Sequence, residues 1–161
     1  MDQSFYITQI NDRSEKSICT RNVLESLPEW FGNKQSLEEY VEQVKDFPFW
    51  CACLKSGQYI GFFSAKIHYG HTGDLFVCGV LPEYQRRGIG EALYKTVESW
   101  FIQNGCNFVI VKTLSDIVTY EPYAKTRKFY EKLGFSPLIT LTEMWDENNP
   151  CLIMLKPLSQ I

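Results

Sequence analysis

The chain has 161 residues, of which 45% are hydrophobic, 15% aromatic and 22% charged, a composition typical of a folded globular protein. This length is enough for one substantial hydrophobic core, so we predict a single domain over residues 1–161. The formal net charge of -3 argues against nucleic acid as a partner, because binding a polyanion requires a basic surface.

The N-terminus and the cysteines indicate the compartment. Residues 1–9 alternate polar and apolar side chains, unlike a signal peptide, and no later run approaches ~20 apolar residues. We therefore predict a cytoplasmic protein without a membrane partner. The six cysteines follow neither metal-ligand nor disulfide spacing, so we predict buried free thiols and no metal. The alternative is a metal or redox pair at Cys51 and Cys53, which share one face of a predicted strand.

The first half of the chain combines strands with two helices. Periodicity predicts a strand at residues 5–10 and a helix at 17–27, which Pro28 ends. A second helix is expected at residues 36–45, with Ser36 as its N-cap. Three adjacent antiparallel strands are then predicted at 49–54, 59–68 and 75–81, separated by turns at 56–57 and 70–73.

The second half alternates helices with strands. Apolar residues at helical spacing predict a helix at 89–103, and an apolar, β-branched run predicts a buried strand at 108–114. After a loop that contains Pro122, we expect a helix at 124–133, ended by Gly134, and strands at 138–144 and 151–155. This order predicts an α/β fold with helices on the faces of a mixed sheet.

The most informative segment is residues 80–92, where a strand runs through a basic turn into the strongest predicted helix. Gly88 and Gly90 omit the Cβ atoms that would keep a phosphate from the main chain, while the helix N-terminus, Arg86 and Arg87 favour negative charge. The dinucleotide fingerprint is excluded because Leu93 replaces its third glycine, and a P-loop lysine is absent. We predict a pyrophosphate site; the alternative is a tight turn with solvated arginines.

Two motifs identify a family. QRRGIG at residues 85–90 follows VLP at 80–82, and FYEKLGF occupies residues 129–135. With these motifs the chain closely resembles the GCN5-related N-acetyltransferase (GNAT) family. The resemblance implies a mixed, largely antiparallel central sheet of about seven strands flanked by about four helices. It also implies acetyl-CoA as co-substrate and direct transfer of its acetyl group to a primary amine of a small molecule or peptide.

The resemblance further implies a cofactor site built mostly from backbone. The strand end formed by Cys78, Gly79 and Val80 would bulge and bind the pantetheine arm. Backbone N–H groups of the loop and first helical turn would bind the pyrophosphate; these residues are Gln85, Arg86, Arg87, Gly88, Ile89, Gly90 and Glu91.

The same resemblance suggests residues for proton transfer. Tyr130 holds the position of a tyrosine that protonates the departing CoA thiolate, and a phenol with a pKa near ~10 suits that role. The alternative is packing beside its neighbours. Asp74 holds the position where histone-type members carry a glutamate base, although a plain turn is an equal reading. His68 and His71 are reserve candidates for the base, because histidine titrates near neutral pH.

Acceptor choice in the family implicates residues 22–40 and 145–150. These segments are aromatic and acidic, so we predict that Trp30 and Trp145 contact a cationic amine. Tyr123 replaces an asparagine of many relatives and would line the same pocket. The alternative is that Trp30 packs in the core and that residues 146–150 form a solvated turn. A catalytically silent acyl-CoA-binding regulatory module, a longer acyl group and a hydroxyl acceptor remain open, as does a homodimer.

Overall fold

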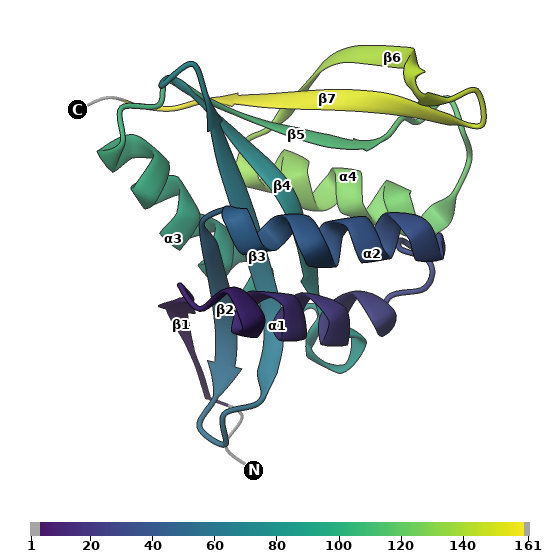
Figure 1. Ribbon diagram of the computed structural model, residues 1–161. Coiled ribbons are helices and arrows are strands. Elements are labelled where there is room, and N and C mark those ends of the chain that lie inside the picture. The colour runs from purple at the N-terminus through teal and green to yellow at the C-terminus, as the bar shows by residue number, and fades with distance from the viewer. Residues whose placement is uncertain (1–3, 160–161) are drawn as a thin grey trace. The chain divides into compact units, whose positions relative to one another are not determined.

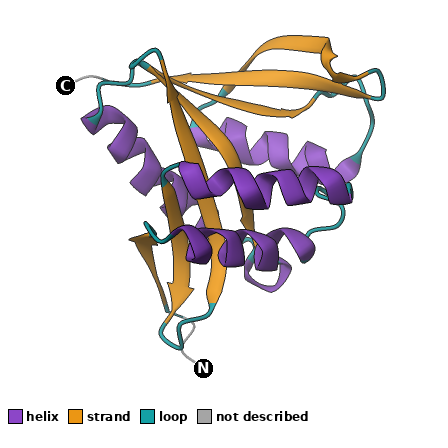
Figure 2. Ribbon diagram, in the orientation of Figure 1, coloured by secondary structure: helices purple, strands orange, loops and turns teal. Residues whose placement is uncertain are grey.

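The computed structural model describes residues 4–159. Seven strands and four α-helices follow one another within these residues in the order β1, α1, α2, β2, β3, β4, α3, β5, α4, β6, β7 (Figure 1). The strands form one sheet in the order β1-β2-β3-β4-β5-β7-β6, and Figure 2 distinguishes the strands from the helices by colour. The predicted α/β class, with seven strands and four helices, is confirmed.

The described chain divides into two compact units. The first comprises the residues up to Lys66 and Phe76–Trp100, and the second comprises Ile67–Leu75 and the residues from Phe101 onward. Strands β3 (Tyr59–His68) and β4 (Thr72–Val80) contribute residues to both.

The first unit is built on antiparallel strands. β1 (Phe5–Gln9) pairs with β2 (Phe49–Leu54), and β2 pairs with β3. Side chains alternate between the two faces of these strands. Trp50 and Phe63 lie on one face and contact Trp100 and Tyr94 of α3 (Ile89–Gln103), with ring centroids 5.1 and 6.5 Å apart.

Helix α1 (Arg13–Glu25) begins four residues before the predicted start. Asp12 caps it by accepting a hydrogen bond from the backbone N–H of Glu15 at 2.9 Å. Apolar periodicity missed the first turn because that turn is polar. Its one buried member, Lys16, donates its ammonium hydrogen to the Phe47 carbonyl at 2.7 Å.

Helix α2 (Lys34–Gln43) corrects the predicted N-cap. Asn33, not Ser36, holds that position, and its side-chain oxygen accepts a hydrogen bond from the Ser36 backbone N–H at 3.0 Å. Ser36 is therefore the third helical residue. Asparagine and serine cap helices about equally well, so residue preference alone could not show which of the two begins the helix.

Strand β4 also begins earlier than predicted. Gly73 lies inside the strand rather than in the turn, because a Cβ there would come within 2.7 Å of the Phe101 ring. Glycine at this position permits a close approach of helix α3. The turn is confined to residues 69–71, and Asp74 is a strand residue, so the reading of Asp74 as part of a plain turn was wrong.

The second unit contains both parallel and antiparallel pairs. β5 (Phe108–Leu114) pairs in parallel with Thr72–Leu75 of β4 and antiparallel with β7 (Asn149–Pro157). β7 pairs antiparallel with β6 (Ser136–Asp146). These last strands are longer than predicted, because Asp146 accepts hydrogen bonds from Asn148 and Asn149 and closes a tight turn between them.

Helix α4 (Glu121–Leu133) corrects the position of Pro122. This proline lies in the first helical turn and not in the preceding loop, where its missing N–H costs nothing because that group has no intrahelical partner. Gly134, with φ of 105°, ends the helix as predicted.

The six cysteines are free thiols, and five of them are buried. Burial raises the pKa of Cys51 to about 12, which keeps this thiol protonated and unreactive at neutral pH. Among residues 4–159, no group of three or more His, Cys, Asp or Glu is placed to hold a metal ion. No helix within the same residues is long and apolar enough to cross a membrane.

Candidate functional site

The loop between β4 and α3 has an unusual backbone. After a 3-10 turn at Pro82–Tyr84, residues 85–88 are exposed and α3 begins at Ile89. Arg86 has φ of 64° and Gly88 has φ of 80°, so two left-handed residues alternate with two others. Backbone of this kind turns successive N–H groups toward one side and forms an anion-binding concavity.

The start of α3 adds further donors to this loop. The Ala92 N–H donates to the Gly88 carbonyl at 3.0 Å, which is the first hydrogen bond of the helix. The N–H groups of Ile89, Gly90 and Glu91 precede that bond and therefore have no partner within the helix. The positive end of the helix dipole lies at the same place.

Two side chains of the loop contact neighbouring residues. The Arg87 guanidinium lies 5.6 Å from the centre of the Tyr84 ring. Gln85 donates its side-chain N–H to the Val80 carbonyl at 3.0 Å, which ties the loop to the end of β4. Sequence reasoning assigned Gln85 only a backbone contact and missed this bond.

The end of β4 departs from regular alternation. Phe76 contacts Tyr40 of α2, with ring centroids 5.4 Å apart, while a Cβ on Gly79 would come within 2.9 Å of Leu27, which follows α1. Helices α1 and α2 pack side by side over one face of the first unit (Figure 1). Residues three apart in a regular strand face opposite sides, so these contacts indicate an irregularity in β4 between Phe76 and Gly79. The bulge expected at Cys78 to Val80 stays a prediction.

Tyr130 lies in α4 of the second unit. Its side chain is only 5% exposed and its ring packs between Phe129 and Phe135, at centroid distances of 5.5 and 5.7 Å. The predicted packing contact with Phe129 is therefore present.

Asp74 contacts an imidazole and an ammonium group in the second unit. Its Oδ2 lies 2.7 Å from Nε2 of His68 and 3.7 Å from Nζ of Lys112. The carboxylate is buried, whereas the other two side chains are partly exposed. His71 is separate from this group, because its Nδ1 contacts the Thr72 hydroxyl at 2.7 Å in the exposed turn. The sequence named His68 and Asp74 as separate candidates and did not name Lys112.

The predicted acceptor residues lie in three places. Trp30 is half-buried in the turn after α1, in the first unit. In the second unit, Tyr123 lies in the first turn of α4 with its ring 6.0 Å from Tyr120, and Trp145 is 44% exposed near the end of β6.

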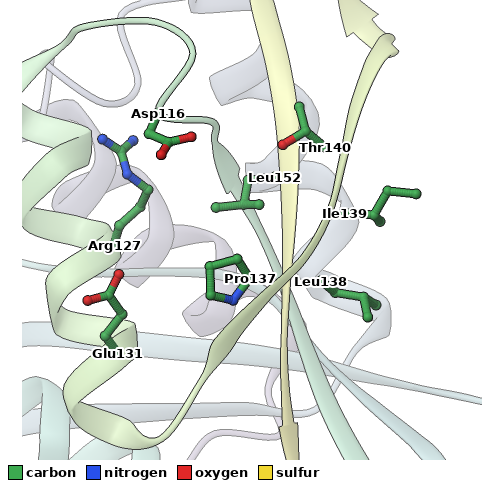
Figure 3. Close-up of a pocket in the computed structure, with 8 residues that line it drawn as sticks. All are labelled: Asp116, Arg127, Glu131, Pro137, Leu138, Ile139, Thr140 and Leu152. Atoms are coloured by element: carbon green, nitrogen blue, oxygen red, sulfur yellow. The ribbon is translucent and has the colours of Figure 1, made fainter.

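The second unit also holds a cavity of about 280 Å³ that contains none of the predicted site residues. Figure 3 shows Asp116, Arg127 and Glu131 on one side and the apolar wall of β6 on the other. Arg127 donates to the Leu114 carbonyl at 2.8 Å. Nothing in the sequence pattern marked these residues, because they come from a loop, a helix and two strands.

Comparison with known proteins gives consistent results. The sequence model of the acetyltransferase (GNAT) family matches residues 20–135. An uncharacterized N-acetyltransferase of Methanocaldococcus jannaschii is 24% identical over 102 residues, which are 62% of this chain and 60% of that protein. The chain thus spans about 60% of the length of this curated relative.

Solved structures share the fold. A structure from Desulfovibrio desulfuricans assigned to the GNAT family superimposes with a TM-score of 0.83 at 20% identity, covering 97% of this chain and all of the other. An aminoglycoside 6'-N-acetyltransferase complexed with coenzyme A superimposes with a TM-score of 0.73 at 18% identity, covering 94% of this chain and 96% of that one.

Proposed function

Because the chain belongs to the acetyltransferase (GNAT) family, we propose that it transfers the acetyl group of acetyl-CoA to a primary amine of a small molecule or peptide. The observation that carries this proposal is the backbone of residues 85–91. Two left-handed residues and the start of α3 present N–H groups at an exposed loop, which is the arrangement that a pyrophosphate requires.

The cofactor contacts divide into two parts. The N–H groups of the loop, Gln85 to Glu91, bind the pyrophosphate, and the end of β4, Cys78 to Val80, binds the pantetheine arm. Gln85 supports both parts because its side chain joins the loop to Val80. The solved relative with bound coenzyme A supports this choice of co-substrate.

The chemistry is direct attack of the amine on the thioester carbon. A neutral amine forms the C–N bond, and the C–S bond then breaks. Tyr130 donates its phenolic proton to the departing thiolate and recovers a proton from the new amide nitrogen. General acid catalysis of this kind contributes typically ~10²–10⁴-fold to the rate. The proton-accepting side of the site is built on Asp74.

The acceptor is a cationic amine in this proposal. Trp30, Tyr123 and Trp145 supply aromatic faces, which attract ammonium groups, and the net charge of -3 favours a cation over a polyanion. We place this activity in the cytoplasm, where the six free thiols stay reduced. A homodimer stays a prediction.

One observation favours a second candidate function. The near-complete burial of Tyr130 between two phenylalanine rings also suits a purely structural role. A protein of this kind would bind acetyl-CoA without acetylating an amine and would act as a regulatory module.

The proposed function is tested by measuring both the binding of acetyl-CoA and its turnover with amines. Calorimetry measures the Kd of acetyl-CoA, and a thiol-release assay follows turnover with polyamines, aminoglycosides, amino acids and peptides. We expect saturable binding and amine-dependent release of CoA. Binding without release on every amine would support the silent module, and no binding would exclude both functions.

Tyr130→Phe tests the proposed acid within the same assay. We expect kcat to fall by about 10²-fold or more while the Kd of acetyl-CoA and the melting temperature stay unchanged, because phenylalanine preserves the ring contacts. Tyr94→Phe, at a buried tyrosine of α3, is the matched control and should keep full activity. An unchanged kcat in Tyr130→Phe would remove this residue from the mechanism.

A further inference from the structure

The His68, Asp74 and Lys112 side chains form a cluster on three strands and differ in their exposure to solvent. We refer to it as the β3–β4–β5 cluster. The Asp74 side chain is 5% exposed, whereas Lys112 is 32% and His68 is 41% exposed. The carboxylate at the centre is therefore closed to solvent, and the imidazole is its open end. Of the three side chains, the imidazole is the most accessible to an external group.

The strand pairing fixes this cluster. Asp74 of β4 lies opposite Ile110 of β5, and Lys112 is two residues further along β5, so Lys112 shares a face with Ile110. Gly73 on the other face of β4 packs against Phe101. The carboxylate is held on its side of the sheet by backbone pairing and has little freedom to turn outward.

The contact with Asp74 determines which ring nitrogen of His68 carries the proton. The carboxylate accepts a hydrogen bond at 2.7 Å from Nε2, so the neutral imidazole has its proton on Nε2 and its lone pair on Nδ1. Lys112, at 3.7 Å from the same carboxylate oxygen, places a positive charge beside the buried carboxylate.

We propose that Nδ1 of His68 takes the proton from the acceptor ammonium, and that Asp74 is a positioning residue that acts through this histidine. The inference rests on the proposed acetyl transfer and refines its proton-accepting side. It replaces Asp74 as the group that contacts the acceptor.

The step balances in protons and electrons. An N–H bond of the ammonium breaks, its electron pair stays on nitrogen, and an N–H bond forms at Nδ1. The resulting imidazolium is stabilised by the Asp74 carboxylate. The neutral amine attacks the thioester, and His68 later releases its proton to water through its exposed edge. The net reaction converts an ammonium and a thioester into an amide, a thiol and one proton.

The first test needs no turnover. The chain contains two histidines, so long-range proton–nitrogen NMR spectra of the labelled protein show two imidazole rings, and His71→Gln assigns them. We expect neutral His68 to carry its proton on Nε2, and we expect Asp74→Asn to lose that preference. A neutral His68 protonated on Nδ1 in the wild-type protein would overturn the proposal.

The second test uses the pH profile of kcat/KM. Asp74 from β4 contacts His68, and Lys112 from β5 contacts the same carboxylate oxygen of Asp74. On the strand of His68, Lys66 lies over the rings of Phe47 and Phe76. Asp74→Asn should shift the midpoint of the acid limb to lower pH, because it removes a negative charge. Lys112→Met should shift that midpoint to higher pH, because it removes a positive charge. If Asp74 and Lys112 had only structural roles, the two variants would not shift the midpoint of the acid limb in opposite directions.

His68→Gln completes the test, with His71→Gln as its matched control. We expect His68→Gln to lower kcat/KM by about 10²-fold or more, to abolish the acid limb and to leave the Kd of acetyl-CoA unchanged. His71→Gln should behave as wild type. An acid limb that persists in His68→Gln contradicts the inference but leaves acetyl transfer intact. A wild-type protein that binds acetyl-CoA and acetylates no amine contradicts both.

Discussion

The loop at residues 85–91 and the β3–β4–β5 cluster are built on opposite principles. The loop is contiguous in sequence and acts through main-chain N–H groups, which two left-handed residues and the start of α3 orient. The cluster draws one side chain from each of three strands, and its contacts are side chain to side chain.

This difference sets how each region tolerates substitution. A backbone site depends on dihedral angles, so it is sensitive to the residue that adopts an unusual φ and insensitive to exposed side chains. A side-chain site depends on the identity of each member. Variants of the loop should therefore change the affinity for acetyl-CoA and leave the pH profile unaltered, and variants of the cluster should do the reverse.

Gly88→Ala should have the largest effect among the loop variants. Open space surrounds this glycine, and its φ is 80°, so alanine introduces no clash and costs about 1–2 kcal/mol through the left-handed backbone alone. If the loop relaxes to avoid this cost, its N–H groups turn away. We expect a roughly tenfold higher Kd for acetyl-CoA by calorimetry.

Gly57→Ala is the matched control for this variant. Gly57 has φ of 94° and is likewise surrounded by open space, but it lies in the turn between β2 and β3. It should lose a similar amount of stability in denaturant unfolding and none of its affinity for acetyl-CoA. Equal losses of affinity in both variants would show that strain anywhere in the first unit weakens binding, which would contradict a specific role for the loop.

The contrast also explains what could be predicted from the sequence. Phe49–Leu54, Tyr59–His68, Ile89–Gln103 and Phe108–Leu114 were predicted with their observed bounds, because apolar periodicity and turn residues define them. The polar first turn of α1 and the proline in the first turn of α4 were missed, because these ends depend on capping and not on burial.

The candidate site shows the same division. The loop motif lies in one segment, so the sequence alone located the glycines and the arginines. The cluster could not be assembled in advance, because the pairing of Lys112 with Asp74 depends on the register of β4 and β5. His68 and Asp74 were both named, but their contact requires the fold of the β3–β4 hairpin.

Gln85→Ala should have an intermediate effect, because it tests the one side chain that supports the loop backbone. It removes the hydrogen bond to the Val80 carbonyl, and a hydrogen bond of this kind is worth about 1 kcal/mol. We expect the Kd of acetyl-CoA to rise about fivefold. Gln85→Glu is the matched control: it keeps the length of the side chain but places an acceptor against the carbonyl, so it should weaken binding at least as much. If both variants bind as wild type, the loop holds its shape without this bond.

Arg87→Gln should have the smallest effect. The guanidinium is exposed and lies beside the Tyr84 ring, and an exposed charge contributes about 0–1 kcal/mol. We expect the Kd of acetyl-CoA to rise about twofold to threefold at low salt. In ~1 M salt the Debye length is only about 3 Å, so the Kd should then match that of the wild-type protein. A tenfold loss of affinity that persists in high salt would show that the loop recognises the cofactor through its side chains. The loop and the cluster would then both act through side chains, and the contrast between them would be lost.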